Sequence, residues 1–347
     1  MNIDPDPPYR RIATEEAWSP PRMMDMYRAG VKDGAISDPG FLSLWGHYLF
    51  SDSERAELIR KRITDLDDVR LADMDAAGIH RQIVALTAPG VQIFDTDTAV
   101  AFAREANDEL AERIARHPDR FAGLAAAAPQ DPAAAAREIE RAVKKLGFKG
   151  VIVNSHTHGE YLDDQRFWPI FEAAQALDAP VYLHPGTPPA DMIKPFLKRG
   201  LDGAIYGFAV ETGMHLLGII ISGAFDRFPA LKVLVGHAGE ALPFWLYRLE
   251  FMHNAMVKAG RYPTVKPLKK RIGDYLRENV WVTTSGMAWE PAIMFLYQIM
   301  GPDHLMYAMD YPYQYVPGEV AVSDALPMDV VDKKKFFQDN AELVFKL

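Results

Sequence analysis

The stretch Leu305-Met306-Tyr307-Ala308-Met309-Asp310-Tyr311-Pro312-Tyr313 is an apolar run that ends on a carboxylate. Five such residues in a row predict a strand that is buried on both faces, and the proline that follows prevents the hydrogen-bonded ladder from continuing. Asp310 is therefore expected at the tip of this strand. An unpaired carboxylate there would cost several kcal/mol, so we expect a cationic partner, either a basic side chain or a metal ion.

Three other stretches place titratable residues at the end of a predicted strand. The run 181–186 reaches His184 before a proline and a glycine, and the run 233–239 reaches His237 between two glycines. Near the start of the chain, the run 11–16 ends on Glu15 and Glu16. Four strand ends that carry Glu, His, His and Asp suggest convergence on one point.

The order of predicted elements favours a closed (β/α)8 barrel of the α/β class. Eight predicted strands alternate with helices, which implies parallel pairing through right-handed crossovers. Such a barrel takes about 250 residues. The rest of the 347-residue chain then forms an irregular, aromatic-rich loop at 38–50, after strand one, and a closing helix at 333–345. We expect a single domain over 1–347; an open, doubly wound sheet is the alternative and would separate Glu15 from Asp310.

Composition narrows the classes of partner. The net charge of -9, without a long basic run, argues against nucleic acid and favours a small-molecule partner. The chain has no cysteine, which excludes disulfides and thiolate metal sites. Residues 1–8 lack the pattern of a signal peptide, so we expect a cytoplasmic protein. The apolar window 205–225 is interrupted by Glu211 and His215, which fits a buried or subunit-covered helix, not a membrane span. It predicts a homodimer or homotetramer.

The strand ends predict a catalytic metal site. In a closed parallel barrel all strand C-termini open onto one face, so Glu15, His184 and Asp310 can bind one divalent cation with open positions left over. Two carboxylates and one imidazole suit manganese or zinc. Glu16 points to the opposite side of its strand, toward the helices. The alternative is an ordinary ion pair between His184 and Asp310.

Other residues are candidates for proton handling and substrate binding. Glu240 follows His237 by three residues and would fix its tautomer and keep it basic, although a structural histidine is the alternative. Arg55 and Arg248 would bind an anionic substrate through two parallel hydrogen bonds, and a surface salt bridge is the alternative for each. Phe208 and Tyr313 would form flat apolar walls, unless they pack in the core. We interpret four further histidines as loop, packing or surface residues: His156, His158, His215 and His253.

The chain resembles the decarboxylases of the amidohydrolase superfamily, which include 2,3-dihydroxybenzoate, γ-resorcylate and aminocarboxymuconate semialdehyde decarboxylases. The resemblance covers nearly the whole chain and is strongest to members that act on 5-carboxyvanillate. Glu15 and Ala17 stand where many members of the superfamily have two histidines, which argues against a binuclear hydrolytic site. The motifs that carry the resemblance lie at 13–17, 53–56, 73–76, 86–90, 128–132, 210–215, 236–248 and 307–313.

This resemblance implies a metal-dependent, non-oxidative decarboxylation of an ortho-hydroxy aromatic acid, with 5-carboxyvanillate as the favoured substrate, Asp310 as the proton donor and no organic cofactor. One divalent ion, manganese in preference to zinc, would be bound by Glu15, His184 and Asp310. The alternatives are a γ-resorcylate or 2,3-dihydroxybenzoate decarboxylase, a metal-dependent hydrolase of the same superfamily, and a barrel that only binds an aromatic acid. The implied substrate pocket contains Arg55, Thr87, Phe208, His237, Arg248 and Tyr313.

Overall fold

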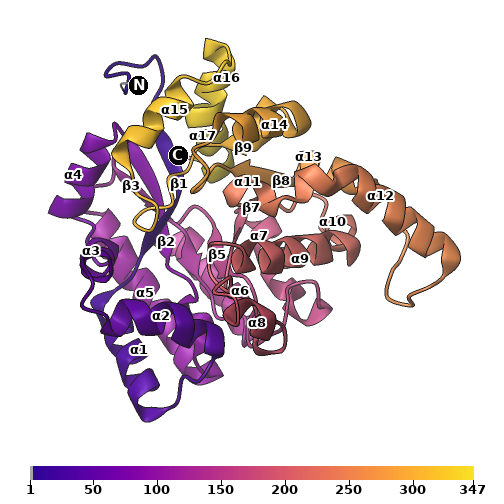
Figure 1. Ribbon diagram of the computed structural model, residues 1–347, viewed down its shortest axis with the longest axis horizontal. Helices are drawn as coiled ribbons and strands as arrows, with labels where there is room; N and C mark the ends of the chain where they lie inside the picture. Colours follow the sequence, from indigo (N-terminus) through magenta and orange to yellow (C-terminus); the bar gives the residue numbers. More distant parts are fainter. Residues whose placement is uncertain (1–2) are drawn as a thin grey trace.

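Short parallel strands form the centre of the molecule, and helices surround them (Figure 1). The computed structural model describes residues 3–347. Each pairing between neighbouring strands is parallel, in the orders β1-β2-β3 and β4-β5-β6-β7-β8-β9. The strands are β1 (Ile12–Trp18), β2 (Arg81–Leu86), β3 (Phe121–Gly123), β4 (Ala125–Ala126), β5 (Val151–Asn154), β6 (Val181–His184), β7 (Val233–Val235), β8 (Val280–Thr283) and β9 (Leu305–Met306).

Backbone hydrogen bonds close the two ladders into one barrel. Strands β3 and β4 are halves of one strand around Leu124, whose N–H donates to a carbonyl of β2. At the other seam, Thr14 N donates to Tyr307 O at 3.1 Å and Ala17 N donates to Tyr311 O at 2.7 Å. The first and last strands are therefore neighbours, which confirms the predicted (β/α)8 barrel and excludes the open sheet.

The barrel interior is filled by apolar side chains from successive strands, as expected for strands that are covered on both faces. Most of the remaining apolar core lies between the strands and the helices. The helices are α1 (Pro21–Asp33), α2 (Pro39–Phe50), α3 (Glu54–Ile63), α4 (Asp68–Ala76), α5 (Thr96–Ile114), α6 (Pro132–Leu146), α7 (Trp168–Ala176), α8 (Ala190–Leu197), α9 (Gly207–Ile221), α10 (Ala224–Arg227), α11 (His237–Glu240), α12 (Leu242–Ala259), α13 (Ile272–Asn279), α14 (Glu290–Met300), α15 (Val320–Asp324), α16 (Val330–Lys334) and α17 (Asn340–Phe345). The interior side chains are Ile12, Ile83, Ala122, Ile152, Tyr182, Leu234, Trp281 and Met306.

The aromatic-rich insertion after strand one is a helix, α2, and the prediction of an irregular loop at 38–50 was wrong. Asp38 caps the helix by accepting a hydrogen bond from Phe41 N at 2.8 Å, and Pro39 occupies the first turn. Phe41 and Trp45, one turn apart, are buried beside the ring of Tyr27 on α1. Tertiary packing therefore orders a segment whose composition suggested a loop.

The structure gives more detail on two predicted helical segments, the closing helix and the long apolar helix. The closing helix at 333–345 consists of α16, a π-helical turn η5 (Lys335–Asp339) and α17. By length and composition the segment Gly207–Arg227, which covers α9 and α10, could cross a membrane, but half of its most apolar window is buried inside the molecule. A single helix of this kind is weak evidence for a membrane span.

Candidate metal centre and substrate pocket

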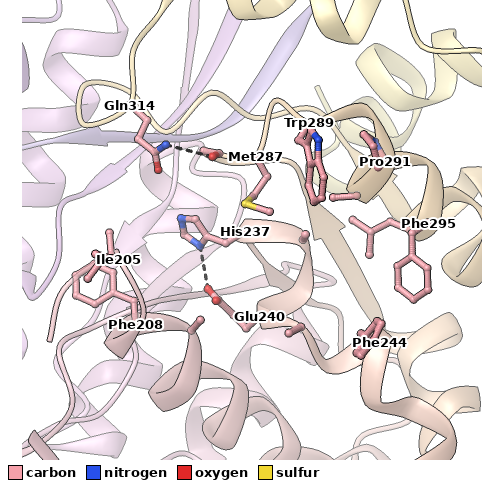
Figure 2. Close-up of a pocket in the computed structure, with 17 residues that line it drawn as sticks. Ile205, Phe208, His237, Glu240, Phe244, Met287, Trp289, Pro291, Phe295 and Gln314 are labelled. Atoms are coloured by element: carbon pink, nitrogen blue, oxygen red, sulfur yellow. Dashed lines mark hydrogen bonds and ion pairs between the residues drawn. The ribbon is translucent and has the colours of Figure 1, made fainter. Parts of the chain in front are cut away.

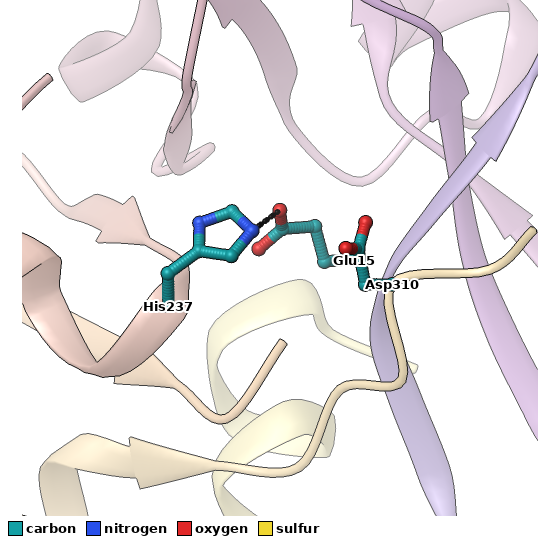
Figure 3. Close-up of side chains that lie close together, drawn as sticks. All are labelled: Glu15, His237 and Asp310. Atoms are coloured by element: carbon teal, nitrogen blue, oxygen red, sulfur yellow. Dashed lines mark ion pairs between the residues drawn. The ribbon is translucent and has the colours of Figure 1, made fainter. Parts of the chain in front are cut away.

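Four titratable side chains meet at the C-terminal mouth of the barrel. Glu15 comes from β1, His184 from the end of β6, His237 from the turn after β7, and Asp310 from the segment after β9. Figure 3 shows Glu15, His237 and Asp310 side by side, and one ligand atom from each lies within 4.8 Å of the others. The Nε2 atom of His184 lies 3.5 Å from Oε1 of Glu15. Barrel closure thus brings together the residues that the strand-end pattern singled out.

Glu15 and His184 face each other as two hydrogen-bond acceptors. Nδ1 of His184 donates to Pro185 O at 2.8 Å, and burial lowers the pKa of His184, so Nε2 carries a lone pair in the neutral ring. Oε1 of Glu15 is buried and has no hydrogen-bond partner among residues 3–347. A divalent cation that binds both atoms would satisfy them, so these residues fit a metal ion.

His237 has a different electrostatic environment. Burial alone would lower the pKa of His237, but Glu15 and Glu240 raise it to about 10. Its Nδ1 donates to Oε1 of Glu240 at 2.9 Å, and its Nε2 lies 3.6 Å from Oε1 of Glu15. A protonated imidazole donates hydrogen bonds and has no lone pair for a metal. His237, and not His184, completes the compact group with Glu15 and Asp310, whereas His184 approaches Glu15.

Asp310 is held in place through the backbone on both sides. The carboxylate of Glu16 accepts hydrogen bonds from Met309 N at 3.0 Å and from Tyr311 N at 3.1 Å. Glu16 therefore lies outside the barrel, as its strand position predicted, but its direct partners are backbone N–H groups and not a cation. Burial raises the pKa of Asp310, His237 opposes the rise and Glu15 adds to it, and the net pKa is about 7. Asp310 can thus carry a proton near neutral pH.

Several of these residues have a left-handed backbone. The φ angles are 48° at His237, 51° at Glu240 and 67° at Asp310. This conformation costs an L-residue about 1–3 kcal/mol and is found preferentially at functional sites. The surrounding packing therefore stabilises a geometry that the local sequence disfavours.

A cavity of about 410 Å³ opens onto this cluster. Four residues that the sequence predicted as substrate-binding line it, namely Arg55, Thr87, Phe208 and Tyr313. Oγ1 of Thr87 lies 2.7 Å from the Tyr313 hydroxyl, and Nη2 of Arg55 donates to Tyr313 O at 2.9 Å. Two hydroxyl groups and a guanidinium thus line the cavity together with His184, His237 and Asp310.

Seven further lining residues were not among the site residues predicted from the sequence: Leu44, Tyr48, Ala88, Pro185, Ala204, Ile205 and Gln314. Leu44 and Tyr48 project from α2, and Gln314 follows the Asp310 segment. The signal for the first two was the aromatic-rich insertion itself, because a long insertion near a barrel mouth is often functional.

Arg248 does not line this cavity. It lies on α12 with its side chain exposed, whereas the other predicted substrate-binding residues face the metal cluster. Within one subunit it is therefore separate from the site.

A second, more apolar cavity of about 600 Å³ adjoins the first (Figure 2). The two share Phe208, His237 and Gln314, while Phe244 and Trp289 belong to the second alone. His184 and Asp310 line the first cavity and are absent from the described lining of the second. We therefore assign the reaction to the smaller cavity.

His156 and His158 make hydrogen bonds to backbone carbonyls away from this cluster. His156 Nε2 donates to Thr187 O at 2.9 Å, and His158 Nε2 donates to Phe94 O at 3.1 Å. These two pin the loop after β5.

Comparison with known proteins places this site in a family. Residues 59–347 match the amidohydrolase family. The manganese-bound 5-carboxyvanillate decarboxylase of Novosphingobium aromaticivorans, solved with 4-hydroxy-3-methoxy-5-nitrobenzoic acid, is 55% identical, with a TM-score of 0.97 over 100% of both chains. The 5-carboxyvanillate decarboxylase of Sphingomonas paucimobilis is 39% identical, with a TM-score of 0.91 over 97% of this chain and 99% of that one.

The γ-resorcylate decarboxylase of a Polaromonas species is 39% identical over 83% of this chain and 90% of its own length. The resemblance stated from the sequence motifs is thereby confirmed. This chain belongs to the amidohydrolase family and is an enzyme of its decarboxylase group.

Proposed function

We propose that this enzyme removes CO2 from an ortho-hydroxy aromatic carboxylic acid, with 5-carboxyvanillate as the substrate and vanillate as the product. The observation that carries this proposal is the compact group of Glu15, His237 and Asp310, with His184 3.5 Å from Glu15, beside an apolar cavity with an arginine at its wall. Full-length similarity to two 5-carboxyvanillate decarboxylases supports the choice of substrate.

We assign Glu15, His184 and Asp310 as ligands of one divalent cation, manganese in preference to zinc. Two carboxylates and one neutral imidazole form a hard ligand set, and a relative binds manganese. When bound, the cation supplies positive charge that holds the carboxylate and the neighbouring phenolate of the substrate. Because three protein ligands leave coordination positions open, the set fits a catalytic metal.

Asp310 delivers the proton in this scheme. Its carboxyl group transfers a proton to the ring carbon that bears the carboxylate, and the ring temporarily loses its aromaticity. The bond from that carbon to the carboxylate then breaks, CO2 leaves, and the electron pair returns to the ring. Asp310 regains its proton from solvent. The ortho hydroxyl is required because its oxygen is a ketone in the dearomatised ring and can accept the electron pair of the breaking carbon–carbon bond.

His237 and Glu240 assist at the phenolate. The protonated imidazole, oriented by Glu240, would donate a hydrogen bond to the phenolate oxygen or relay a proton. Arg55 would bind a second carboxylate of the substrate, Thr87 and Tyr313 would donate hydroxyl hydrogen bonds, and Phe208 would pack on the ring. Positioning of the substrate and the positive charge of the metal would lower the activation barrier for dearomatisation, so no organic cofactor is needed.

We also propose a homodimer or homotetramer in which Arg248 serves a neighbouring subunit. The exposed face of α12 carries Phe244, Trp245 and Tyr247 beside Arg248, and a second copy would cover this apolar surface. Because Arg248 lies outside the cavity of its own subunit, it can reach substrate only across such an interface. Location in the cytoplasm stays a prediction from the sequence.

The test is a product assay with the manganese-loaded protein. We expect one vanillate and one CO2 for each 5-carboxyvanillate consumed, loss of turnover after chelation, and recovery when Mn²⁺ is returned. Faster turnover of γ-resorcylate or 2,3-dihydroxybenzoate would reassign the substrate within the group. Consumption of a lactone or amide without CO2 release would favour the hydrolase instead.

A further inference from the structure

The two oxygens of the Glu15 carboxylate have different surroundings. Oε1 faces His184 and His237, at 3.5 and 3.6 Å from their Nε2 atoms. Oε2 points down into the barrel, where it accepts a hydrogen bond from the Tyr182 hydroxyl and lies 3.3 Å from Oγ1 of Thr283. One oxygen is thus free for a metal, and the other is occupied by hydroxyl groups.

These hydroxyl groups form a directed chain. Ser285 N donates to Oγ1 of Thr283 at 3.5 Å, and Thr283 and Tyr182 share a hydrogen bond of 2.9 Å. Because the single Tyr182 proton points to the carboxylate, the Thr283 hydroxyl is left to donate either to the tyrosine oxygen at 2.9 Å or to Oε2 of Glu15 at 3.3 Å. Each hydrogen bond in such a chain polarises the next, which strengthens the donor that reaches Glu15.

A glycine provides the space for this arrangement. A Cβ atom at Gly236 would lie 2.1 Å from Oε2 of Glu15, far inside contact distance. Any larger residue there would push the carboxylate away from Tyr182. Strand β7 therefore contributes to the same geometry as β6, which carries Tyr182, and β8, which carries Thr283.

We propose that Tyr182, supported by Thr283, is a positioning residue that fixes the Glu15 carboxylate so that Oε1 faces the metal; this inference rests on the proposed metal site. Torsion about the terminal bond of a glutamate is broad and roughly two-fold, so an unrestrained carboxylate would sample many orientations. Ordering it before the metal arrives reduces the entropy lost on binding. Tyr182 touches neither substrate nor metal and acts only through Glu15.

The test measures metal affinity and does not depend on turnover. Metal-free protein is titrated with Mn²⁺, and free Mn²⁺ is followed by electron paramagnetic resonance. We expect Tyr182→Phe to bind Mn²⁺ about 10- to 100-fold more weakly than wild type, as for other residues that orient metal ligands. The matched control is Tyr27→Phe, which also removes a buried hydroxyl, one that donates to Gly90 O at 2.7 Å. It should bind Mn²⁺ with wild-type affinity.

A second pair of variants covers the case in which Tyr182→Phe fails to fold. Thr283→Val has the same shape as threonine but no hydroxyl, and it should also weaken Mn²⁺ binding. Thr283→Ser keeps the hydroxyl and should restore the affinity. A purely structural role would affect folding alone and would not separate these two variants by Mn²⁺ affinity.

Two results would overturn the inference in distinguishable ways. If Glu15→Gln loses Mn²⁺ binding while Tyr182→Phe and Thr283→Val keep wild-type affinity, the positioning role is wrong and the metal site stands. If Glu15→Gln itself keeps wild-type affinity, the proposed ligand set fails together with the inference.

Discussion

In the proposed mechanism, Asp310 is both a metal ligand and the proton donor. It follows a short strand, its backbone is left-handed, and burial raises its pKa to about 7. The same carboxyl group can therefore approach a cation and hold a proton near neutral pH.

We predict that Asp310→Asn lowers kcat for 5-carboxyvanillate by at least about 10²–10⁴-fold, the usual contribution of a general acid. The amide cannot donate an acidic proton to the ring carbon. Steady-state assays of CO2 release at saturating Mn²⁺ provide the measurement. Asp303→Asn removes an exposed carboxylate that pairs with Lys335 and should leave the rate unchanged. A normal rate in Asp310→Asn would show that another group is the donor.

Glu16 supports Asp310 from outside the barrel, and its replacement should affect stability. In Glu16→Gln the oxygen can still accept one backbone N–H, but the amide NH2 faces the other. One buried donor then lacks a partner, which costs about 1–3 kcal/mol. We expect this loss in the free energy of unfolding measured with urea. The control Glu112→Gln, on an exposed helix face, should change the free energy of unfolding little. An equal loss of stability in both variants would contradict the supporting role of Glu16.

At the scale of elements, a buried polar network joins the end of β5 to α9. Oγ of Ser155 lies 2.7 Å from both oxygens of Glu211 and 3.1 Å from Nδ1 of His215, and Nε2 of His215 accepts from Leu162 N at 2.9 Å. Burial raises the pKa of Glu211 to about 7 and lowers the pKa of His215 to about 3. Each group therefore links folding to pH, in opposite directions.

The sign for Glu211 follows from its raised pKa. The native state keeps a proton that the unfolded chain releases, so this contribution is complete below pH 4.5 and is lost as pH rises through about 7. We predict that wild type loses about 1–3 kcal/mol relative to Glu211→Gln between pH 5 and pH 8.5. Urea unfolding of both proteins at pH 5, 7 and 8.5 measures this difference. Parallel pH profiles would contradict the shift.

At the scale of the whole molecule, α12 extends from the barrel (Figure 1). Several of its exposed side chains are aromatic. Phe244 is 70% and Tyr247 is 83% exposed, which is unusual for large apolar side chains that gather on one helix. Arg248 lies beside these side chains. In the proposed oligomer this face of α12 would therefore both form the subunit interface and bring a guanidinium to the substrate of the neighbouring subunit.

We predict that Tyr247→Lys shifts the mass of the protein in solution from an oligomer toward the 38.9 kDa protomer. A charge buried in an apolar interface weakens association. Size-exclusion chromatography with light scattering gives the mass. Leu343→Lys, at a similarly exposed apolar position on α17, should leave the mass unchanged. A protomer mass for wild type would exclude the oligomer and the role of Arg248 across an interface.

The sequence by itself determined the barrel and singled out Glu15, His184, His237 and Asp310, although β1 continues past Glu15 to Trp18 and Glu15 does not end its strand. Buried parallel strands give continuous apolar runs, and the residue after each run lies at the mouth of the barrel whatever else the chain does. The sequence motifs also indicated the protein family. These features depend on local pattern and strand direction, which a single sequence displays.

Only the tertiary structure decided how the groups at the mouth face one another. It ordered α2 as a helix that brings Leu44 and Tyr48 to the cavity, and it placed Arg248 outside. It also directed one oxygen of Glu15 to Tyr182 and the other to the metal side. These outcomes follow from contacts between residues far apart in the chain and from packing that imposes left-handed backbone angles, and neither leaves a periodic signal in the sequence.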